Sequence, residues 1–291
     1  RKSNSGPSLS WKARAAGSTV PIRRNPDMDP EYATRYFEYE KTHWWFRARR
    51  RVLKALLDHG IGWENVTRLL EIGSGSGANL AALYPEEVEL TGIEPDGASA
   101  DLARERGIAT IHTGVLEDAP RLLGGESFEA ITLFDVLEHV EDDRAALGIL
   151  NGLLKPEGWL VLSVPAYQWL WSRHDDVNHH FRRYTRPMLV NRIAEAGFQV
   201  HTATYFNTVL FLPIVALRLL GKLWGGRGVR GSSDMDLPRA GLNELLYRIF
   251  AFERTLLRRI ALPFGVSLFV LARREPAPAP VPTQSALPVP S

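Results

Sequence analysis

The chain has 291 residues, enough for one large domain or two small ones. Its net charge of +2 is too small to indicate a nucleic-acid partner, and none is expected. The absence of cysteine excludes disulfides, thiolate metal sites and a cysteine nucleophile, and it fits a reducing compartment, so a cytoplasmic location is expected. With 45% hydrophobic residues, the chain can bury a core.

Both ends are predicted to be disordered. Residues 1–28 are rich in Ser, Gly, Pro and basic residues and lack the apolar stretch of a secretory signal. Residues 275–291 repeat Pro and Ala, which is typical of an extended tail. One domain is expected over residues 29–274, and it begins with two helices at residues 29–40 and 46–59.

The most informative segment is LLEIGSGSGAN at residues 69–79. An apolar run over residues 68–72 predicts a strand, and glycines follow it at every second position. Gly73 permits a tight turn, Gly75 lets a ligand approach bare backbone, and Gly77 lets the next helix pack close to the strand. This pattern predicts a turn that binds an adenosine-type cofactor.

Strands and helices alternate through the rest of the domain. Further strands are predicted at residues 88–94, 109–112, 130–134, 159–164 and 199–205, and helices at residues 78–83, 98–106, 143–154 and 188–196. This alternation predicts an α/β fold, a doubly wound and mostly parallel sheet with helices on both faces.

The glycines alone do not decide between two cofactors. Gly73, Gly75 and Ala78 also satisfy the G-x-G-x-x-G/A pattern of dinucleotide-binding folds. Glu94 ends the second strand, 21 residues after Gly73, where a carboxylate can bind ribose hydroxyls of either cofactor. A nicotinamide-dependent oxidoreductase is therefore one hypothesis.

Three ordered motifs favour another family. Glu71 precedes the glycines, DVLEHV occupies residues 135–140, and LLKPEGWLVLSVP occupies residues 153–165. With these motifs the chain resembles the class I S-adenosylmethionine-dependent methyltransferases, in particular the small-molecule branch that includes quinone-biosynthesis enzymes. The resemblance covers residues 43–205 and a final strand.

The resemblance implies a Rossmann-like sheet of seven strands with an N-terminal helical cap and an antiparallel last strand. The only good candidate for that strand is VSLFVLA at residues 266–272, so residues 206–262 become an insertion between strands six and seven. The resemblance implies S-adenosyl-L-methionine as the cofactor. The residues that it assigns to cofactor binding are Glu71, Gly73, Ser74, Gly75, Gly77, Glu94, Pro95, Val115, Leu116, Glu117, Phe134 and Asp135.

The acceptor side is predicted in the segment after strand five, WLWSRHDDVNHHFRRY at residues 169–184. A histidine there could take a proton from an attacking hydroxyl, with a carboxylate to orient it. His179 or His180 is favoured, with His174 as a third candidate. The alternatives are a loop held together by Asp–Arg bonds and a His/Asp metal site, although the spacing matches no zinc pattern and no metal is assigned.

Other side chains are candidates for acceptor binding. In this segment they are Arg182, Arg183 and Tyr184. At the joint before strand one, Trp44 and Trp45 could line a cap, and Arg47 could meet the cofactor carboxylate. Plain core packing of the tryptophans is equally consistent with the sequence.

The insertion carries two apolar segments, at residues 206–220 and 242–260, flanked by arginines and separated by a Gly/Ser-rich link. The first is too short and too interrupted for a membrane span. Three interpretations remain open: a helical cap that completes the core, a lid over an apolar acceptor, or an element that contacts an anionic membrane at its inner face.

Three functions are therefore compared. The leading hypothesis is a methyltransferase that acts on a small or lipid-like acceptor, at oxygen. The second is the nicotinamide-dependent oxidoreductase, and the third is a non-catalytic, membrane-associated module that keeps the fold. The final antiparallel strand and the DVLEHV motif oppose the second hypothesis, and the intact glycines and acids oppose the third.

Overall fold

A computed structural model describes residues 37–216 and 238–276. It contains one seven-stranded sheet with the order β3-β2-β1-β4-β5-β7-β6, in which only β7 runs antiparallel to its neighbours. The strands are β1 (Arg68–Ile72), β2 (Glu89–Glu94), β3 (Thr110–Thr113), β4 (Phe128–Phe134), β5 (Leu154–Pro165), β6 (Phe198–Phe206) and β7 (Ser267–Arg274). The predicted α/β fold class is confirmed.

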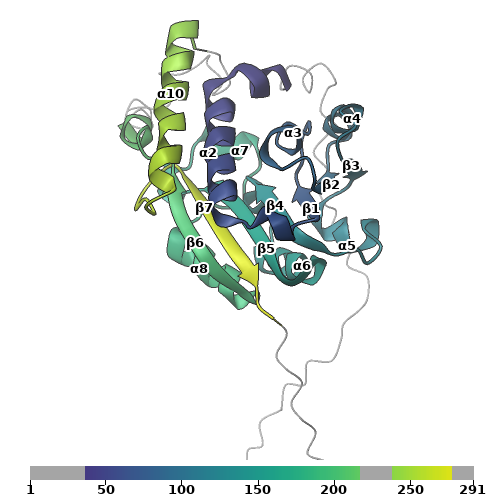
Figure 1. Cartoon of the computed structure of the whole chain (residues 1–291). Helices are drawn as coiled ribbons and strands as arrows, with labels where there is room; N and C mark the ends of the chain where they lie inside the picture. The colour runs from purple at the N-terminus through teal and green to yellow at the C-terminus, as the bar shows by residue number, and fades with distance from the viewer. Residues whose placement is uncertain (1–36, 217–237, 277–291) are drawn as a thin grey trace, which may run out of the picture.

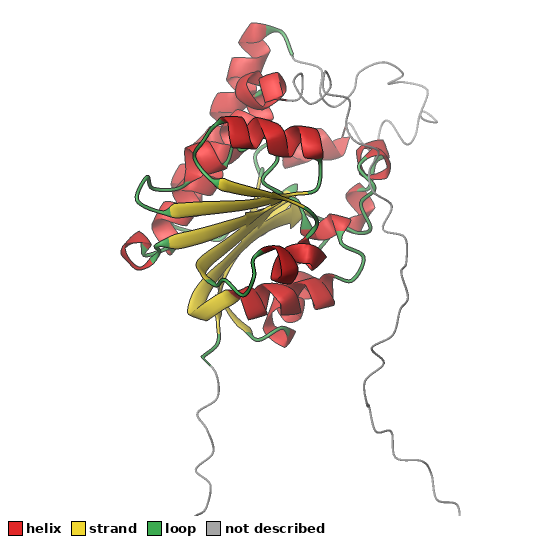
Figure 2. Cartoon of the chain, turned by 90° about the vertical axis from the view of Figure 1, so that its right-hand side faces the viewer, coloured by secondary structure: helices red, strands yellow, loops and turns green. Residues whose placement is uncertain are grey.

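Helices cover both faces of the sheet (Figures 1 and 2). One face packs against α5 (Ala119–Leu122), α6 (Asp143–Leu153) and α8 (Arg186–Glu195). The other packs against α2 (Trp44–Gly60), α3 (Leu80–Leu83), α4 (Gly97–Glu105) and α10 (Ala240–Leu257). Short elements complete the chain: α7 (Arg173–Val177) and the 3₁₀ turns at Trp63–Asn65, Leu116–Asp118, Leu137–His139 and Gln168–Leu170.

Local sequence signals explain where the helices begin and end. Asp96 accepts a hydrogen bond from the Ser99 backbone N–H at 2.8 Å and so caps α4, and Asp142 does the same for α6 through Ala145 at 3.0 Å. Gly197, with φ of +84°, ends α8 in the left-handed conformation that glycine adopts at low cost.

Strand residues alternate between the two cores, as the two-residue period of a strand requires. In β7, Leu268 and Val270 face α6 and α8, whereas Phe269 and Leu271 face α2 and α10. In β1, Leu70 and Ile72 face the α6 side, so Glu71 faces the opposite side, where Tyr84 binds it. This alternation therefore places Glu71, the acid before the glycine turn, on the side of the sheet covered by α2 and α3.

Some boundaries differ from the sequence prediction. Strand β5 begins at Leu154 rather than Trp159, because Leu154 pairs with Phe128 of β4. Trp44 and Trp45 lie in the first turn of α2 rather than between two helices. The predicted N-terminal arm (1–28), the link at residues 225–236 and nearly all of the tail (275–291) lie outside the described residues.

The second half of the insertion completes the core. Helix α10 lies beside α2 (Figure 1), and its Phe250, fully buried, stacks on Phe206 at 6.2 Å between ring centroids and meets the edge of Trp44 at 6.2 Å. Among the described residues, no helix is long and apolar enough to cross a membrane. The inner face of α10 is therefore part of the core.

A matched pair of substitutions tests this packing. Phe250→Ala should lower the free energy of unfolding by about 3–5 kcal/mol, because it leaves a cavity between α2, α10 and β6. Phe252→Ala, two residues along the same helix at a side chain 59% exposed, should change it by less than about 0.5 kcal/mol. Urea denaturation measures both, and equal losses would show that α10 does not pack as described.

Candidate active site

The glycine turn between β1 and α3 is held in place by the neighbouring strand. The backbone N–H groups of Gly73 and Ser74 both donate to the Ile93 carbonyl of β2, at 2.8 and 3.2 Å. Gly75 has φ of +53°, and nothing lies within 4 Å of the position where its side chain would begin. The turn therefore leaves bare backbone beside open space, as a bound cofactor requires.

Glu94 is bound directly to this turn. Its carboxylate accepts hydrogen bonds from the Gly75 N–H at 2.8 Å and from the Asp96 N–H at 3.0 Å. The side chain is 7% exposed, and burial raises the pKa of Glu94 to about 7. The Glu94 carboxylate at the end of β2 thus lies directly on the backbone of the glycine turn.

Glu71 supports the turn from the side of α3. It is fully buried, and its two oxygens accept hydrogen bonds from Asn79 at 3.1 Å and from the Tyr84 hydroxyl at 2.9 Å. Burial raises the pKa of Glu71 to about 7. These two bonds tie Glu71 to the segment that follows the glycines.

The expected adenine side lies next to Glu94. The Gly114 N–H donates to the Glu94 carbonyl at 3.0 Å, which places the turn after β3 beside the end of β2. In that turn Leu116 is buried, whereas Glu117 is exposed, as is Pro95 after β2. Leu116 belongs to the hydrophobic core beside α5 and α6, and Glu117 faces solvent.

Sequence reasoning missed Arg49, which crosses from α2 to the carboxyl edge of the sheet. Its guanidinium pairs with Asp135 at 2.7 Å and donates to the Ser163 hydroxyl at 3.1 Å, and Ser163 donates to Asp135 at 3.1 Å. A signal was present, because Arg49 occupies the same helical stripe as Val52, Leu53 and Leu56. An arginine within an apolar stripe points inward.

It also missed Glu40, in a helical segment at residues 37–42. The Ser76 hydroxyl of the glycine turn donates to the Glu40 carboxylate, and Arg50 donates to the Glu40 carbonyl. Arg106 fixes the other side of Ser76, donating to its carbonyl at 2.6 Å. Burial raises the pKa of Glu40 above its usual value. The N-terminal segment thus lies on the glycine turn.

On the acceptor side, Asp175 organises the loop after β5. It accepts hydrogen bonds from the Ser172 N–H at 2.7 Å and from the Arg183 guanidinium at 2.7 and 2.9 Å, and His180 Nδ1 lies 2.9 Å away. Burial disfavours the charge of Asp175, but hydrogen bonds from His180 and Arg183 outweigh it and hold its pKa below the usual range.

His180 meets two residues of the DVLEHV motif. Its ring lies 4.5 Å from that of His139, edge to face, and candidate ligand atoms of Glu138, His139 and His180 all lie within 4.8 Å of one another. Glu138 is fully buried, and its carboxylate oxygens have no hydrogen-bond partner among the described residues. Burial raises the pKa of Glu138, whereas desolvation and the neighbouring His180 lower that of His139 to about 4. These three groups could also hold a divalent ion.

The other acceptor-side candidates have structural partners. Arg182 donates to the Val140 carbonyl at 2.6 Å, Arg183 is buried on Asp175, and the buried Tyr184 donates to Asp143 at 2.8 Å. His179 is exposed, and the exposed His174 has its ring 6.0 Å from that of His180. The structure therefore brings His180, rather than His179 or His174, into the cluster.

Arg47 does not reach the glycine turn. It pairs with Glu244 of α10 at 3.3 Å and lies over the Tyr247 ring at 4.1 Å. Trp44 donates its backbone N–H to Asn243 at 2.9 Å, and Trp45 packs edge to face on Phe46 at 4.9 Å. Arg47 and Trp44 thus join α2 to α10, whereas Arg49 reaches the carboxyl edge of the sheet.

The fold and the glycine turn of this chain are together those of the S-adenosylmethionine-dependent methyltransferases. Residues 36–203 match the methyltransferase-domain family, and the chain belongs to that family. The ubiquinone biosynthesis O-methyltransferase of Chromobacterium violaceum is 25% identical over 162 residues, which cover 49% of this chain and 69% of that protein. The enzyme of the same name from a Bradyrhizobium species is 32% identical over 108 residues, covering 35% of this chain and 41% of that protein.

Solved structures share the fold. A putative methyltransferase in complex with the Trm112 activator of Haloferax volcanii has a TM-score of 0.54 at 16% identity, covering 84% of this chain and 95% of its own. The plantazolicin methyltransferase BamL also gives 0.54, at 14% identity, covering 84% and 91%. The oxidoreductase and non-catalytic hypotheses find no support among these proteins.

The buried acids predict a pH dependence of stability. Glu94 ionises near pH 4.5 in the unfolded chain and near 7 in the folded one, so between these values the folded state holds the extra proton. The free energy of unfolding of wild type minus that of Glu94→Gln should therefore fall as the pH rises from 4.5 to 7. Urea denaturation at several pH values measures this difference, and a constant difference would contradict the assignment.

Proposed function

We propose that the chain transfers a methyl group from S-adenosylmethionine to a hydroxyl of a small, apolar or lipid-like acceptor. The observation that carries the proposal is the Asp175–His180 pair, which contacts the segment directly after β4, at the sheet edge that also carries the glycine turn. The relatives named O-methyltransferases support oxygen as the accepting atom.

The residues present fit the cofactor. We assign Gly73, Gly75 and Gly77 to its methionyl part and Glu94 to its ribose, with Val115, Leu116 and Phe134 beside the adenosine. Three observations support this assignment: the open space at Gly75, the carboxylate at the end of β2, and the buried Ser74 hydroxyl, which has no hydrogen-bond partner among the described residues. Bound S-adenosylmethionine would supply an electrophilic methyl group on a sulfonium.

His180 is proposed as the group that removes the acceptor proton. Its Nδ1 faces the Asp175 carboxylate, so the Nδ1–H donates there and the Nε2 lone pair is left to accept a proton. Asp175, itself held by Arg183 and Ser172, fixes the orientation of the ring. Glu138 and His139 line the same cluster and would face the acceptor hydroxyl.

The neighbouring surface suits an apolar acceptor. Tyr167 stacks on Tyr205 at 5.1 Å, and Trp169, in the loop that carries His180, meets the edge of Phe211 at 6.1 Å. Phe264 packs against Phe211 at 5.4 Å and extends this aromatic group. We also propose that the acceptor is met at an anionic membrane surface, with the protein peripheral to the membrane.

Gly75→Val tests the cofactor assignment. The branched side chain would fill the open space at the turn, so binding of S-adenosylhomocysteine should fall at least 100-fold. Gly148→Val, in α6 on the opposite face of the sheet, should bind as wild type does. Isothermal calorimetry measures binding and circular dichroism checks folding; unchanged binding by Gly75→Val would refute the assignment.

The role of His180 is tested with radiolabelled S-adenosylmethionine and a bacterial membrane-lipid extract as the acceptor pool. His180→Ala should lower label transfer into the organic phase by about 10²–10⁴-fold while binding S-adenosylhomocysteine normally. His179→Asn, at the adjacent exposed position with φ of +55°, is the matched control and should retain activity. If His180→Ala transferred as much label as wild type, His180 would not be the catalytic base and the loop would have only a structural role.

A further inference from the structure

Helix α10 carries two apolar faces, and only one of them is buried. Phe250 and Leu257 face α2 and the sheet. Leu242, Leu245 and Phe252 are 50%, 54% and 59% exposed, and Ile260, in the turn that continues the helix, is 56% exposed. At 100° per residue, these four side chains with Ile249 and Leu256 fall within an arc of about 80°.

This outer stripe is continuous and long. From residue 242 to residue 260 a helix rises about 27 Å, so the stripe runs along the whole outer side of α10. Arg248 and Arg259 lie next to it on the same helical projection. An apolar stripe with basic residues along its edge is typical of helices that lie in a membrane interface.

Exposed apolar residues are concentrated in this region. Eleven large hydrophobic side chains are exposed among the described residues, and seven of them lie between residues 209 and 264. Val209 and Leu212, after β6, are 49% and 69% exposed, and Phe264, before β7, is 41% exposed. The rest of the described surface contributes only four, so the apolar character belongs to the insertion and its flanks.

Charge separates the insertion from the rest of the chain. Residues 206–262 contain nine Arg or Lys and four Asp or Glu, a net charge of +5, whereas the whole chain carries +2. The remainder is therefore acidic, at −3. The described parts of this segment, residues 206–216 and 238–262, contain five Arg and two Glu, so the region that exposes the apolar side chains is basic and attracts anionic headgroups.

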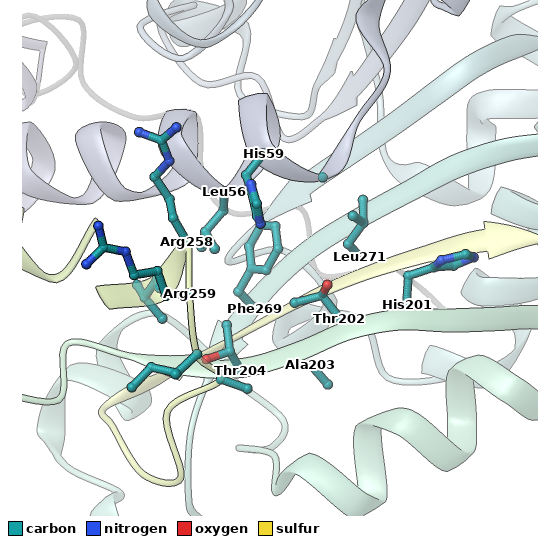
Figure 3. Close-up of a pocket in the computed structure, with 14 residues that line it drawn as sticks. Leu56, His59, His201, Thr202, Ala203, Thr204, Arg258, Arg259, Phe269 and Leu271 are labelled. Carbon is teal, nitrogen blue, oxygen red and sulfur yellow. The ribbon is translucent and has the colours of Figure 1, made fainter. Parts of the chain in front are cut away.

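A cavity of about 260 Å³ lies at the end of the stripe, between α2, α10, β6 and β7 (Figure 3). Its lining includes His59, His201, Arg258 and Arg259 and contains no carboxylate. The two guanidinium groups point away from Thr202 and Ala203 in the cavity floor (Figure 3). Arg259, which borders the stripe, is thus placed for headgroups outside the protein rather than for one small anion inside the cavity.

We propose that the outer stripe of α10 docks on an anionic phospholipid bilayer, with the helix in the interface plane and Arg248 and Arg259 among the headgroups. This inference rests on the proposed lipid-like acceptor and names the surface through which the protein meets it. The alternative is that a second copy of the chain covers the stripe.

Flotation of the full chain with vesicles tests the proposal. Wild type should float with phosphatidylglycerol-containing vesicles, less so in high salt, and at least tenfold less with pure phosphatidylcholine. The double variant Leu245→Glu, Phe252→Glu should lose at least tenfold in the bound fraction. The control Ile108→Glu, at an exposed apolar residue before β3 (42% exposed), should float as wild type does.

Two further measurements separate the outcomes. S-adenosylhomocysteine binding by the double variant should be unchanged, which shows that loss of flotation is not loss of folding or of the cofactor site. Size-exclusion chromatography with light scattering should give the same mass for wild type and variant. Failure of wild type to float, equal flotation of the double variant, or a wild-type dimer that the double variant dissociates would each overturn the proposal.

Discussion

The ion pair between Arg49 and Asp135 fixes the relation between the N-terminal helix and the sheet. A buried guanidinium is costly unless its partner is close, so α2 must lie where Arg49 reaches the end of β4. Ser163 of β5 closes the triangle, binding both groups. The placement of α2 in turn positions the segment that carries Glu40 on the glycine turn and offers the surface on which α10 packs.

A second charged residue, Asp175, fixes the loop after β5 on the acceptor side, as Asp135 fixes α2. It holds Ser172, His180 and Arg183, three points of the loop, in addition to the loop's own backbone hydrogen bonds. Glu138 lies between the two centres, buried and without a hydrogen-bond partner in the described parts of the chain. A ligand group that meets Glu138 would therefore be oriented by a preformed frame, which lowers the entropic cost of aligning reactants.

The positions of the strands, the glycine turn and Glu94 were predictable because each depends on local patterns: apolar runs, two-residue spacing of glycines and an acid at a strand end. The partner of Arg49 was not predictable, because its place in the apolar stripe of α2 indicates that it points inward but not that it meets Asp135, 86 residues further along the chain. Likewise, three histidines within seven residues become distinct only when Asp175 binds one of them. The apolar residues of α10 indicated a helix but not which of its faces would be buried, because packing against α2 decides which face joins the core.

A crystal structure with S-adenosylhomocysteine would test the central claim most directly, because it locates the cofactor and the reacting edge together. We expect the ribose hydroxyls on the Glu94 carboxylate, the methionyl part along Gly73–Gly75, and the sulfur facing the space between Asp135 and the His180 cluster. Density for the ligand elsewhere, for instance in the cavity between α2 and α10, or a sulfur directed away from Glu138 and His180, would contradict it.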